Sequence, residues 1–107
     1  MERTADFSVS VKCEAAEHVV VVAGEVDMAT APEVAAAVDT LGGPDTRLVF
    51  DLTSVTFMDS SGLSVIARTL LRLRQAGGTV CVRGTSPFVR QTIKISGLDQ
   101  CEILDVT

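Results

Sequence analysis

A buried strand, a polar corner and a long amphipathic helix follow one another in the middle of the chain, and this unit restricts its fold more than any other feature. Residues 48–52 are a mainly apolar run with a short sequel that leads to the corner. Behind the corner, leucine and isoleucine recur at positions 63, 66, 70 and 73, which is one face of a helix over residues 63–76. Because both elements have apolar faces to bury, the pattern predicts a layered α/β domain.

The corner carries Asp59, Ser60 and Ser61 in succession. Side chains of these types cap helix N-termini, because their oxygens accept hydrogen bonds from first-turn N–H groups that have no other partner. A helix N-terminus also has a partial positive charge, which stabilises a phosphate on an exposed serine hydroxyl. The local pattern therefore supports two interpretations, a cap and a phosphorylation site, of which caps are the more common.

Strand signals lie on both sides of this unit. Residues 7–13 alternate apolar and polar side chains, which is typical of a strand with one face on the core. Residues 18–23 are an apolar, valine-rich run, which is typical of a strand buried on both faces. The short polar connection between them predicts a hairpin. Further strands are predicted at residues 47–52, 79–83 and 101–104.

A helix is predicted between the second and third strands. After a loop at residues 24–29, Thr30 and Glu33 match a capping box, in which Thr30 is the N-cap and Glu33 returns the bond. Apolar residues at positions 34, 38 and 41 share one helical face. The glycines and proline at residues 42–44 are expected to end this helix.

A short third helix is predicted near the C-terminus. Ser86 is its expected cap and Pro87 its first helical residue, and Gly97 is expected to end it in the left-handed conformation. The expected inward side chains are Val89 and Ile93, with Phe88 and Ile95 as further candidates. The whole chain then has the order β-β-α-β-α-β-α-β.

This order predicts one α/β domain over residues 1–107, with a mixed, mostly parallel sheet of four to five strands and frayed tails at residues 1–5 and 105–107. Loops after the carboxyl ends of parallel strands meet at one edge of a sheet. The loop at Asp27, the corner at Ser60 and the loop at Thr85 and Ser86 should therefore share one rim. That rim is the candidate site.

Charge and hydropathy exclude several function classes. The net charge of −5 disfavours binding to nucleic-acid phosphates and to anionic membranes. The positively charged Arg68 and Arg72, four residues apart, are expected to line a solvated helix face. No apolar stretch is long enough to span a membrane, and the N-terminus has no apolar signal-peptide core. A soluble, cytoplasmic protein is expected.

Cysteine and histidine usage gives no sign of a metal centre. The cysteines are an odd number without a C-x-x-C pair, and they are expected to be reduced core residues: Cys13, Cys81 and Cys101. His18 is the only histidine. Neither a metal site nor a cofactor is therefore expected.

Short motifs distributed over nearly the whole chain occur together here. They are Gly-Glu-Val-Asp at 24–27, Asp-Leu at 51–52, Phe-Met-Asp-Ser-Ser-Gly-Leu at 57–63, Gly-Gly at 77–78 and Ser-Gly-Leu at 96–98. This set resembles the anti-sigma factor antagonists of bacteria, the stand-alone STAS domains. The corner at 57–63 is the specific part of the resemblance, whereas the glycine pair carries little weight alone.

The resemblance implies that Ser60, directly after the aspartate, is phosphorylated by a partner that is both anti-sigma factor and serine kinase, and that Ser61 is mainly a cap. It implies that the unmodified chain binds this ATP-holding partner, which then releases its sigma factor. Phosphorylation would end the association, and a PP2C-like phosphatase would restore it. The chain would not be an enzyme, and it would be a monomer when free. The residues expected at the partner interface are Asp27, Met28, Thr30, Met58, Asp59, Ser61, Gly62, Val65, Thr85 and Ser86.

Other functions fit the sequence less well, and one stays open. A serine hydrolase would want a Gly-x-Ser-x-Gly motif with a later histidine, whereas His18 precedes the corner. A receiver domain phosphorylated on Asp51 would need an acidic pair for Mg²⁺ where only Asp27 stands. A mononucleotide pocket would need a P-loop. The open alternative is a non-switching scaffold subunit of a stress-signalling complex, which would have the same fold.

Overall fold

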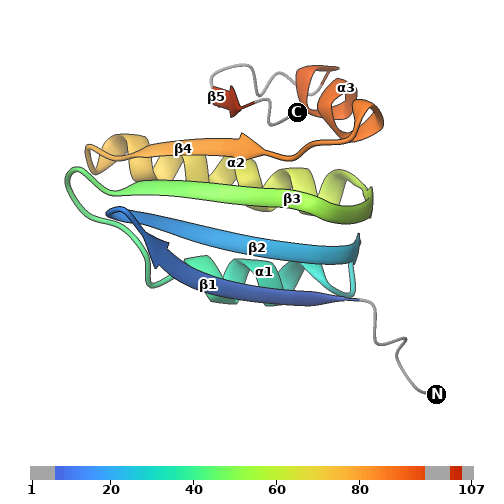
Figure 1. Cartoon of the computed structure of the whole chain (residues 1–107), viewed down its shortest axis with the longest axis horizontal. Helices are drawn as coiled ribbons and strands as arrows, with labels where there is room; N and C mark the ends of the chain where they lie inside the picture. The colour runs from blue at the N-terminus through green and yellow to red at the C-terminus, as the bar shows by residue number, and fades with distance from the viewer. Residues whose placement is uncertain (1–6, 96–101, 105–107) are drawn as a thin grey trace.

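The computed structural model describes residues 7–95 and 102–104, and its elements follow the predicted order (Figure 1). In chain order they are β1 (Ser8–Glu14), β2 (Glu17–Val26), α1 (Ala31–Val38), β3 (Arg47–Met58), α2 (Ser60–Gln75), β4 (Thr79–Arg83), α3 (Pro87–Ile95) and β5 (Glu102–Leu104). One sheet contains all the strands in the order β1-β2-β3-β4-β5. β1 is antiparallel to β2 and the other pairs are parallel, which confirms the predicted mixed sheet.

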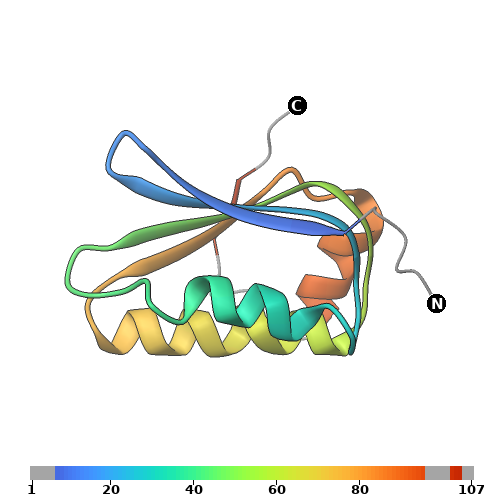
Figure 2. The ribbon, with the colours of Figure 1, turned by 90° about the horizontal axis from the view of Figure 1, so that it is seen from below.

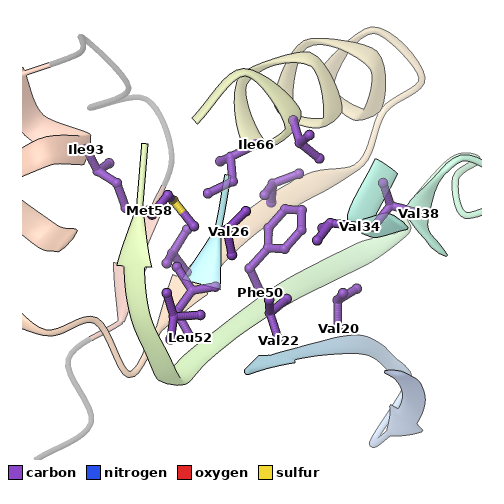
Figure 3. Close-up of a cluster of buried hydrophobic side chains, with 14 of the residues drawn as sticks. Val20, Val22, Val26, Val34, Val38, Phe50, Leu52, Met58, Ile66 and Ile93 are labelled. Atoms are coloured by element: carbon purple, nitrogen blue, oxygen red, sulfur yellow. The ribbon is translucent and has the colours of Figure 1, made fainter. Parts of the chain in front are cut away.

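Helices α1 and α2 lie side by side on one face of the sheet and begin at the same end of it (Figure 2). They begin together because α1 follows β2 and α2 follows β3, two neighbouring parallel strands. The predicted stripe of α2 is buried in the core at Ile66, Leu70 and Leu73. Phe50 lies among these side chains and the valines of β2 and α1 (Figure 3).

β3 is longer than the sequence predicted, because its pairing with β2 is irregular. The apolar run predicted a strand over residues 47–52, but β3 continues to Met58. Its register with β2 shifts twice within residues 21–25 of β2. Each bulge adds a residue to one strand, so it breaks the alternation of buried and exposed side chains. Beyond residue 50 the buried side chains of β3 are spaced by three, at Leu52, Val55 and Met58.

β2 also continues farther than predicted, to Val26, through a glycine that was assigned to a loop. Gly24 has a φ of +91°, a left-handed conformation that glycine adopts at little cost and that commonly accompanies a bulge. The loop before α1 therefore contains only residues 27–30.

Helix α1 is shorter than predicted and is capped differently. It ends at Val38, so Leu41 packs on the core from beyond the helix. Thr30 occupies the N-cap position, but its side chain makes no capping hydrogen bond. The predicted capping box is therefore wrong in its threonine half, because the Thr30 hydroxyl instead accepts from the N–H of Asp27 and donates to the carbonyl oxygen of Glu25.

Arg72 explains how α1 can end early. Its Nη1 donates to the carbonyl oxygen of Leu41 at 2.6 Å and its Nη2 to that of Val38 at 2.8 Å. The carbonyl oxygen of Val38 also accepts from the N–H of Leu41 at 3.0 Å, so Arg72 adds a second donor at the end of α1. Arg72 therefore joins α2 to the end of α1 by hydrogen bonds. The prediction that it lines a solvated face is wrong.

Two side chains differ from the prediction in their burial. Val65, placed off the buried stripe of α2, is only 3% exposed, because α1 covers a second flank of α2. Phe88 was a candidate inward residue of α3 but is exposed, whereas the predicted Val89 and Ile93 are buried.

The sheet face opposite α1 and α2 combines a small apolar cluster with ion pairs. The cluster consists of Val19, Val49 and Cys81, all fully buried. Arg47 pairs with Glu17, and Arg83 contacts both Asp51 and Glu14. The prediction of a core cysteine is confirmed for Cys81, whereas Cys13 on edge strand β1 is exposed.

Some predictions fall outside the described residues. These are the tails at residues 1–5 and 105–107, the helix stop at Gly97, the inward side chain of Ile95 and the position of Cys101. Within the described part of the chain, no helix is long and apolar enough to cross a membrane.

Candidate functional site

Asp59 starts helix α2 and joins it to the sheet. Its backbone is extended, with φ −106° and ψ −168°, and its Oδ1 accepts a hydrogen bond from the N–H of Ser61 at 2.8 Å. Its own N–H donates to the carbonyl oxygen of Val26 at 3.1 Å, which ties the ends of β3 and β2 together. The predicted capping corner is confirmed, but Asp59 is the cap and Ser61 is the residue it caps.

Ser60 is the first residue of α2 and is exposed. Its side chain makes no hydrogen bond to any residue that the structure describes. Since Asp59 already provides the cap, the hydroxyl of Ser60 is not needed for the start of the helix. It is presented to solvent at the positive end of the α2 dipole.

The loop of Asp27 lies beside this corner and is held by its own hydrogen bonds. Asp27 Oδ1 accepts from the N–H of Ala29 at 2.9 Å and from the N–H of Thr30 at 3.1 Å. The Asp27 N–H in turn donates to Thr30 Oγ1 at 2.9 Å, and that hydroxyl donates to the carbonyl oxygen of Glu25 at 2.8 Å. This turn fixes the loop that carries Met28, whose side chain is 80% exposed.

The backbone N–H of Thr30 is the main reason why the pKa of Asp27 lies below its ordinary value of 3.8. Partial desolvation acts in the opposite direction, and hydrogen bonds from Ala29 and the Thr30 hydroxyl add to the lowering. The carboxylate therefore remains ionised at neutral pH and keeps the loop ordered.

We expect Asp27→Asn to lower the free energy of unfolding at neutral pH, and the difference from the natural chain to shrink as the pH falls below about 4. The folded carboxyl has the lower pKa, so its stabilisation is fully present above the unfolded pKa and is lost as the pH falls through the folded pKa. Urea titrations from about pH 2 to about pH 7 measure the difference. A difference independent of pH would contradict this assignment.

Gly62 allows the first turn of α2 to approach the strand ends closely. A Cβ at this position would lie 2.7 Å from Met58 Cγ and 2.8 Å from Val26 Cγ1. Real Cβ atoms do not approach other atoms this closely, so the absence of a side chain is what permits the contact. This explains why a glycine follows the two serines of the corner.

The predicted interface residues around Ser60 fall into two groups by the solvent exposure of their side chains. Exposed or half-buried side chains around Ser60 are those of Asp27, Met28, Asp59 and Ser61. Buried residues that support the corner from inside are Thr30, Met58, Gly62 and Val65. Only the first group offers side chains to a partner, and the second group sets their positions.

The loop of Thr85 and Ser86 follows β4, whose pairing with β3 ends at Asp51 and Arg83. The preceding Gly84 sits against Thr53 of β3, where a Cβ would lie 2.9 Å from the Thr53 backbone nitrogen. β3 then continues through residues 54–58 and curves with β2 toward the helix layer (Figure 2). Ser86 Oγ accepts from the N–H of Val89 at 3.2 Å, which confirms it as the cap of α3. Asp27 and Ser60 come directly after the paired ends of β2 and β3, at Val26 and Met58, or one residue beyond, whereas the loop of Thr85 and Ser86 begins beside Thr53, five residues before Met58.

An open groove that the sequence did not predict runs along the seam between α1 and α2. It consists of two adjoining hollows of about 480 Å³ and 240 Å³, and we call it the α1–α2 groove. The larger hollow begins at Met28 and Ser61. It shares four residues with the smaller one: Ala35, Asp39, Val65 and Arg68. The signal that could have indicated it is the alanine run at residues 35–37, because alanine leaves a helix surface without bulk.

A model of the STAS domain matches residues 9–105. The chain belongs to the STAS domain family. This STAS domain is 34% identical over 104 residues to an anti-sigma-B factor antagonist of Listeria monocytogenes, with 94% of this chain and 91% of that protein covered. The predicted family is thereby confirmed.

Solved structures show the same fold. The crystal structure of an anti-sigma factor antagonist from Mycobacterium paratuberculosis matches this STAS domain with a TM-score of 0.78 at 32% identity, over 96% of this chain and 89% of that one. The Bacillus cell fate determinant SpoIIAA, solved in its phosphorylated form, matches with a TM-score of 0.74 at 21% identity, over 94% of this chain and 92% of that one.

Proposed function

We propose that this STAS domain is an anti-sigma factor antagonist whose binding to an anti-sigma factor is switched off by phosphorylation of Ser60. The observation that carries the proposal is the exposed Ser60 hydroxyl, which follows the capping Asp59 and has no partner within the described chain. Relatives that are named antagonists support the first part. A protein of the same fold that is known in a phosphorylated form is consistent with the second.

The charges around the corner provide a physical basis for the switch. A phosphoserine adds about −1.5 to −2 charges at neutral pH. At Ser60 this charge would join the carboxylates of Asp59 and Asp27 on an already acidic chain. The dipole of α2 offsets part of the cost within the folded chain. A partner that covers the corner would have to desolvate the phosphate beside these carboxylates, so the penalty falls on the complex.

The proposed cycle has two states of the same surface. The unmodified corner binds an anti-sigma factor that holds ATP, and the sigma factor is released in the cytoplasm. The anti-sigma factor then acts as a serine kinase and transfers the γ-phosphoryl group of ATP to Ser60 Oγ, which loses its proton. A PP2C-like phosphatase hydrolyses the phosphate ester and restores binding. In this cycle the STAS domain is a substrate and catalyses neither step.

Mass spectrometry of the protein purified from its own cells tests the proposal. We expect a fraction of molecules to carry one acid-stable phosphate, located on Ser60 by fragmentation, and the unmodified fraction to co-purify with an ATP-binding anti-sigma factor. An acid-labile phosphate would point to an aspartate such as Asp51 and contradict the proposal. Complete absence of phosphate in every growth condition, together with no bound anti-sigma factor, would overturn it.

A further inference from the structure

We infer that the free edge of β1 pairs with β1 of a second copy of this chain, antiparallel about a two-fold axis at Val11. The two five-stranded sheets then form one continuous sheet. The family resemblance implies a monomer, so the inference differs from it on this point. It is independent of the proposed function, because the Ser60 corner lies at the ends of β2 and β3 and not on β1.

Strand β1 is the outermost strand on its side of the sheet, and its edge is open (Figure 1). All its residues except Val9 are exposed. Proteins usually protect such an edge with a proline, a bulge or a very short strand. β1 has none of these, because its seven residues contain no proline and pair with β2 without a register shift. The edge is therefore available for a further strand.

The hairpin turn determines which backbone groups of β1 point to this edge. Its loop consists of residues 15–16, with φ of +49° and +69°, and Glu14 pairs with Glu17 across it. These angles are typical of a type I′ turn, which makes the flanking pair a hydrogen-bonded one. Hydrogen-bonded and non-hydrogen-bonded pairs alternate along an antiparallel ladder. The odd-numbered residues of β1 therefore direct their N–H and C=O groups away from β2. They are Val9, Val11 and Cys13.

An axis at Val11 uses all of these backbone groups. Val11 is the middle residue of β1, so each of the seven residues has a counterpart in the second copy. Val11 lies opposite Val11, and Val9 lies opposite Cys13. Each of these pairs brings together two residues whose N–H and C=O groups point to the edge, so each can exchange two hydrogen bonds. Any other axis leaves residues at an end of β1 without a counterpart.

The apolar side chains of β1 also match in this register. Those of the odd-numbered residues share one face of the sheet, on which Val9 packs against the core. Val11 is 38% exposed in the single chain. In the pair it would be covered by its own counterpart, so the edge contact removes an exposed apolar side chain from water.

The charged side chains favour the same register. Lys12 forms an ion pair with Glu14 of its own strand, with Nζ and Oε2 3.1 Å apart. About the axis at Val11, Lys12 would face Ser10 and Glu14 would face Ser8, so no like charges are opposed. An axis at Lys12 would instead place two lysines directly opposite each other, which is destabilising.

The contact is small, so we expect a dimer that exchanges readily with the monomer. Two paired seven-residue strands bury less than the roughly 1,200 Å² at which standard stable interfaces begin. Strand β2 would run in opposite directions in the two copies, so their Ser60 corners would lie toward opposite ends of the shared sheet. Both corners would remain accessible in the dimer.

Disulfide trapping with a mild oxidant tests the register. We expect Val11→Cys in a Cys13→Ser background to form a covalent dimer, because the Cα atoms of a hydrogen-bonded pair are about 5.5 Å apart, which suits a disulfide. Val9→Cys should be trapped only while Cys13 is present, since Cys13 is its opposite residue. Val9→Cys with Cys13→Ser is the matched control, because its new thiols would lie about 14 Å apart. Peptide mapping locates each bridge.

Sedimentation velocity over a concentration series measures the association. We expect Val11→Lys to raise the Kd of the dimer about tenfold or more, because it places like charges opposite each other at the axis. Leu71→Lys makes the same change at an exposed position of α2 and should dimerise like the natural chain. Circular dichroism confirms that both variants are folded.

The inference is supported if Val9→Cys is trapped with Cys13 and not without it. It is overturned if the natural chain remains monomeric up to about 1 mM and Val11→Cys is not trapped. It is also overturned if Val11→Lys dimerises as well as Leu71→Lys, because the copies would then meet through another surface. None of these outcomes changes the case for Ser60.

Discussion

Ser60→Asp is expected to bind the anti-sigma factor at least about a hundredfold more weakly than the natural chain, a loss of about 3 kcal/mol. The introduced carboxylate would stand at the first residue of α2, next to Asp59, where the paired ends of β2 and β3 also bring Asp27. The fold should be retained, because an acidic residue in the first turn of a helix is favourable. The loss would therefore appear in calorimetric binding and not in thermal unfolding.

Two comparison variants isolate the effect of charge at this position. Ser60→Ala should bind like the natural chain, but added ATP should not release it from an anti-sigma factor with kinase activity, since no acceptor hydroxyl remains. Ser10→Asp adds the same charge at an exposed position of β1 and should bind normally. Tight binding by Ser60→Asp would contradict the proposed electrostatic mechanism.

Phe50→Ala is expected to lower the free energy of unfolding by about 3–5 kcal/mol. Phe50 is 1% exposed and lies in the middle of β3, where it belongs to the main core cluster. Its removal would leave a cavity between the sheet and the helices that the valines around it cannot fill. For a domain of this size the melting temperature should fall by about 15–30 °C.

Phe57→Ala is the matched control for this loss. Phe57 belongs to the same strand but is 41% exposed, so its truncation should cost less than about 1 kcal/mol. Thermal unfolding and urea titration of the two variants give the comparison. Equal losses would show that strand β3 responds to any truncation and that Phe50 has no special place in the core.

The order of the elements and the location of the corner could be predicted because both depend on neighbours in the sequence. The stripe at residues 63, 66, 70 and 73 and the alternation in residues 7–13 follow from the periods of helix and strand. The Ser86 cap of α3 was recognised for the same reason, since an N-cap and the amide it binds are three residues apart. The corner motif likewise was sufficient to predict the family.

Predictions failed where a segment distant in the sequence decides whether a side chain is buried or which group it bonds. Arg68 and Arg72 are equivalent in spacing, yet only Arg72 meets the carbonyls of Val38 and Leu41, which come from another helix. Val65 is buried because α1 covers it, and no pattern within α2 contains that information. The Thr30 hydroxyl does not cap α1, because the chain leaving β2 places it against the backbone of Glu25 and Asp27, with which it makes hydrogen bonds instead.

The sequence by itself therefore determined the α/β class, the order of strands and helices, and a serine directly behind a capping aspartate, since local hydrogen bonds and side-chain periodicity suffice for these. The tertiary structure alone decided how far β3 extends, which of three loops lie together, and that a groove opens between α1 and α2. The bulges lengthen β3 relative to β2, and Gly62 allows α2 to begin close to the ends of both strands. Such features depend on contacts between segments far apart in the chain, and local residue preferences do not predict these contacts.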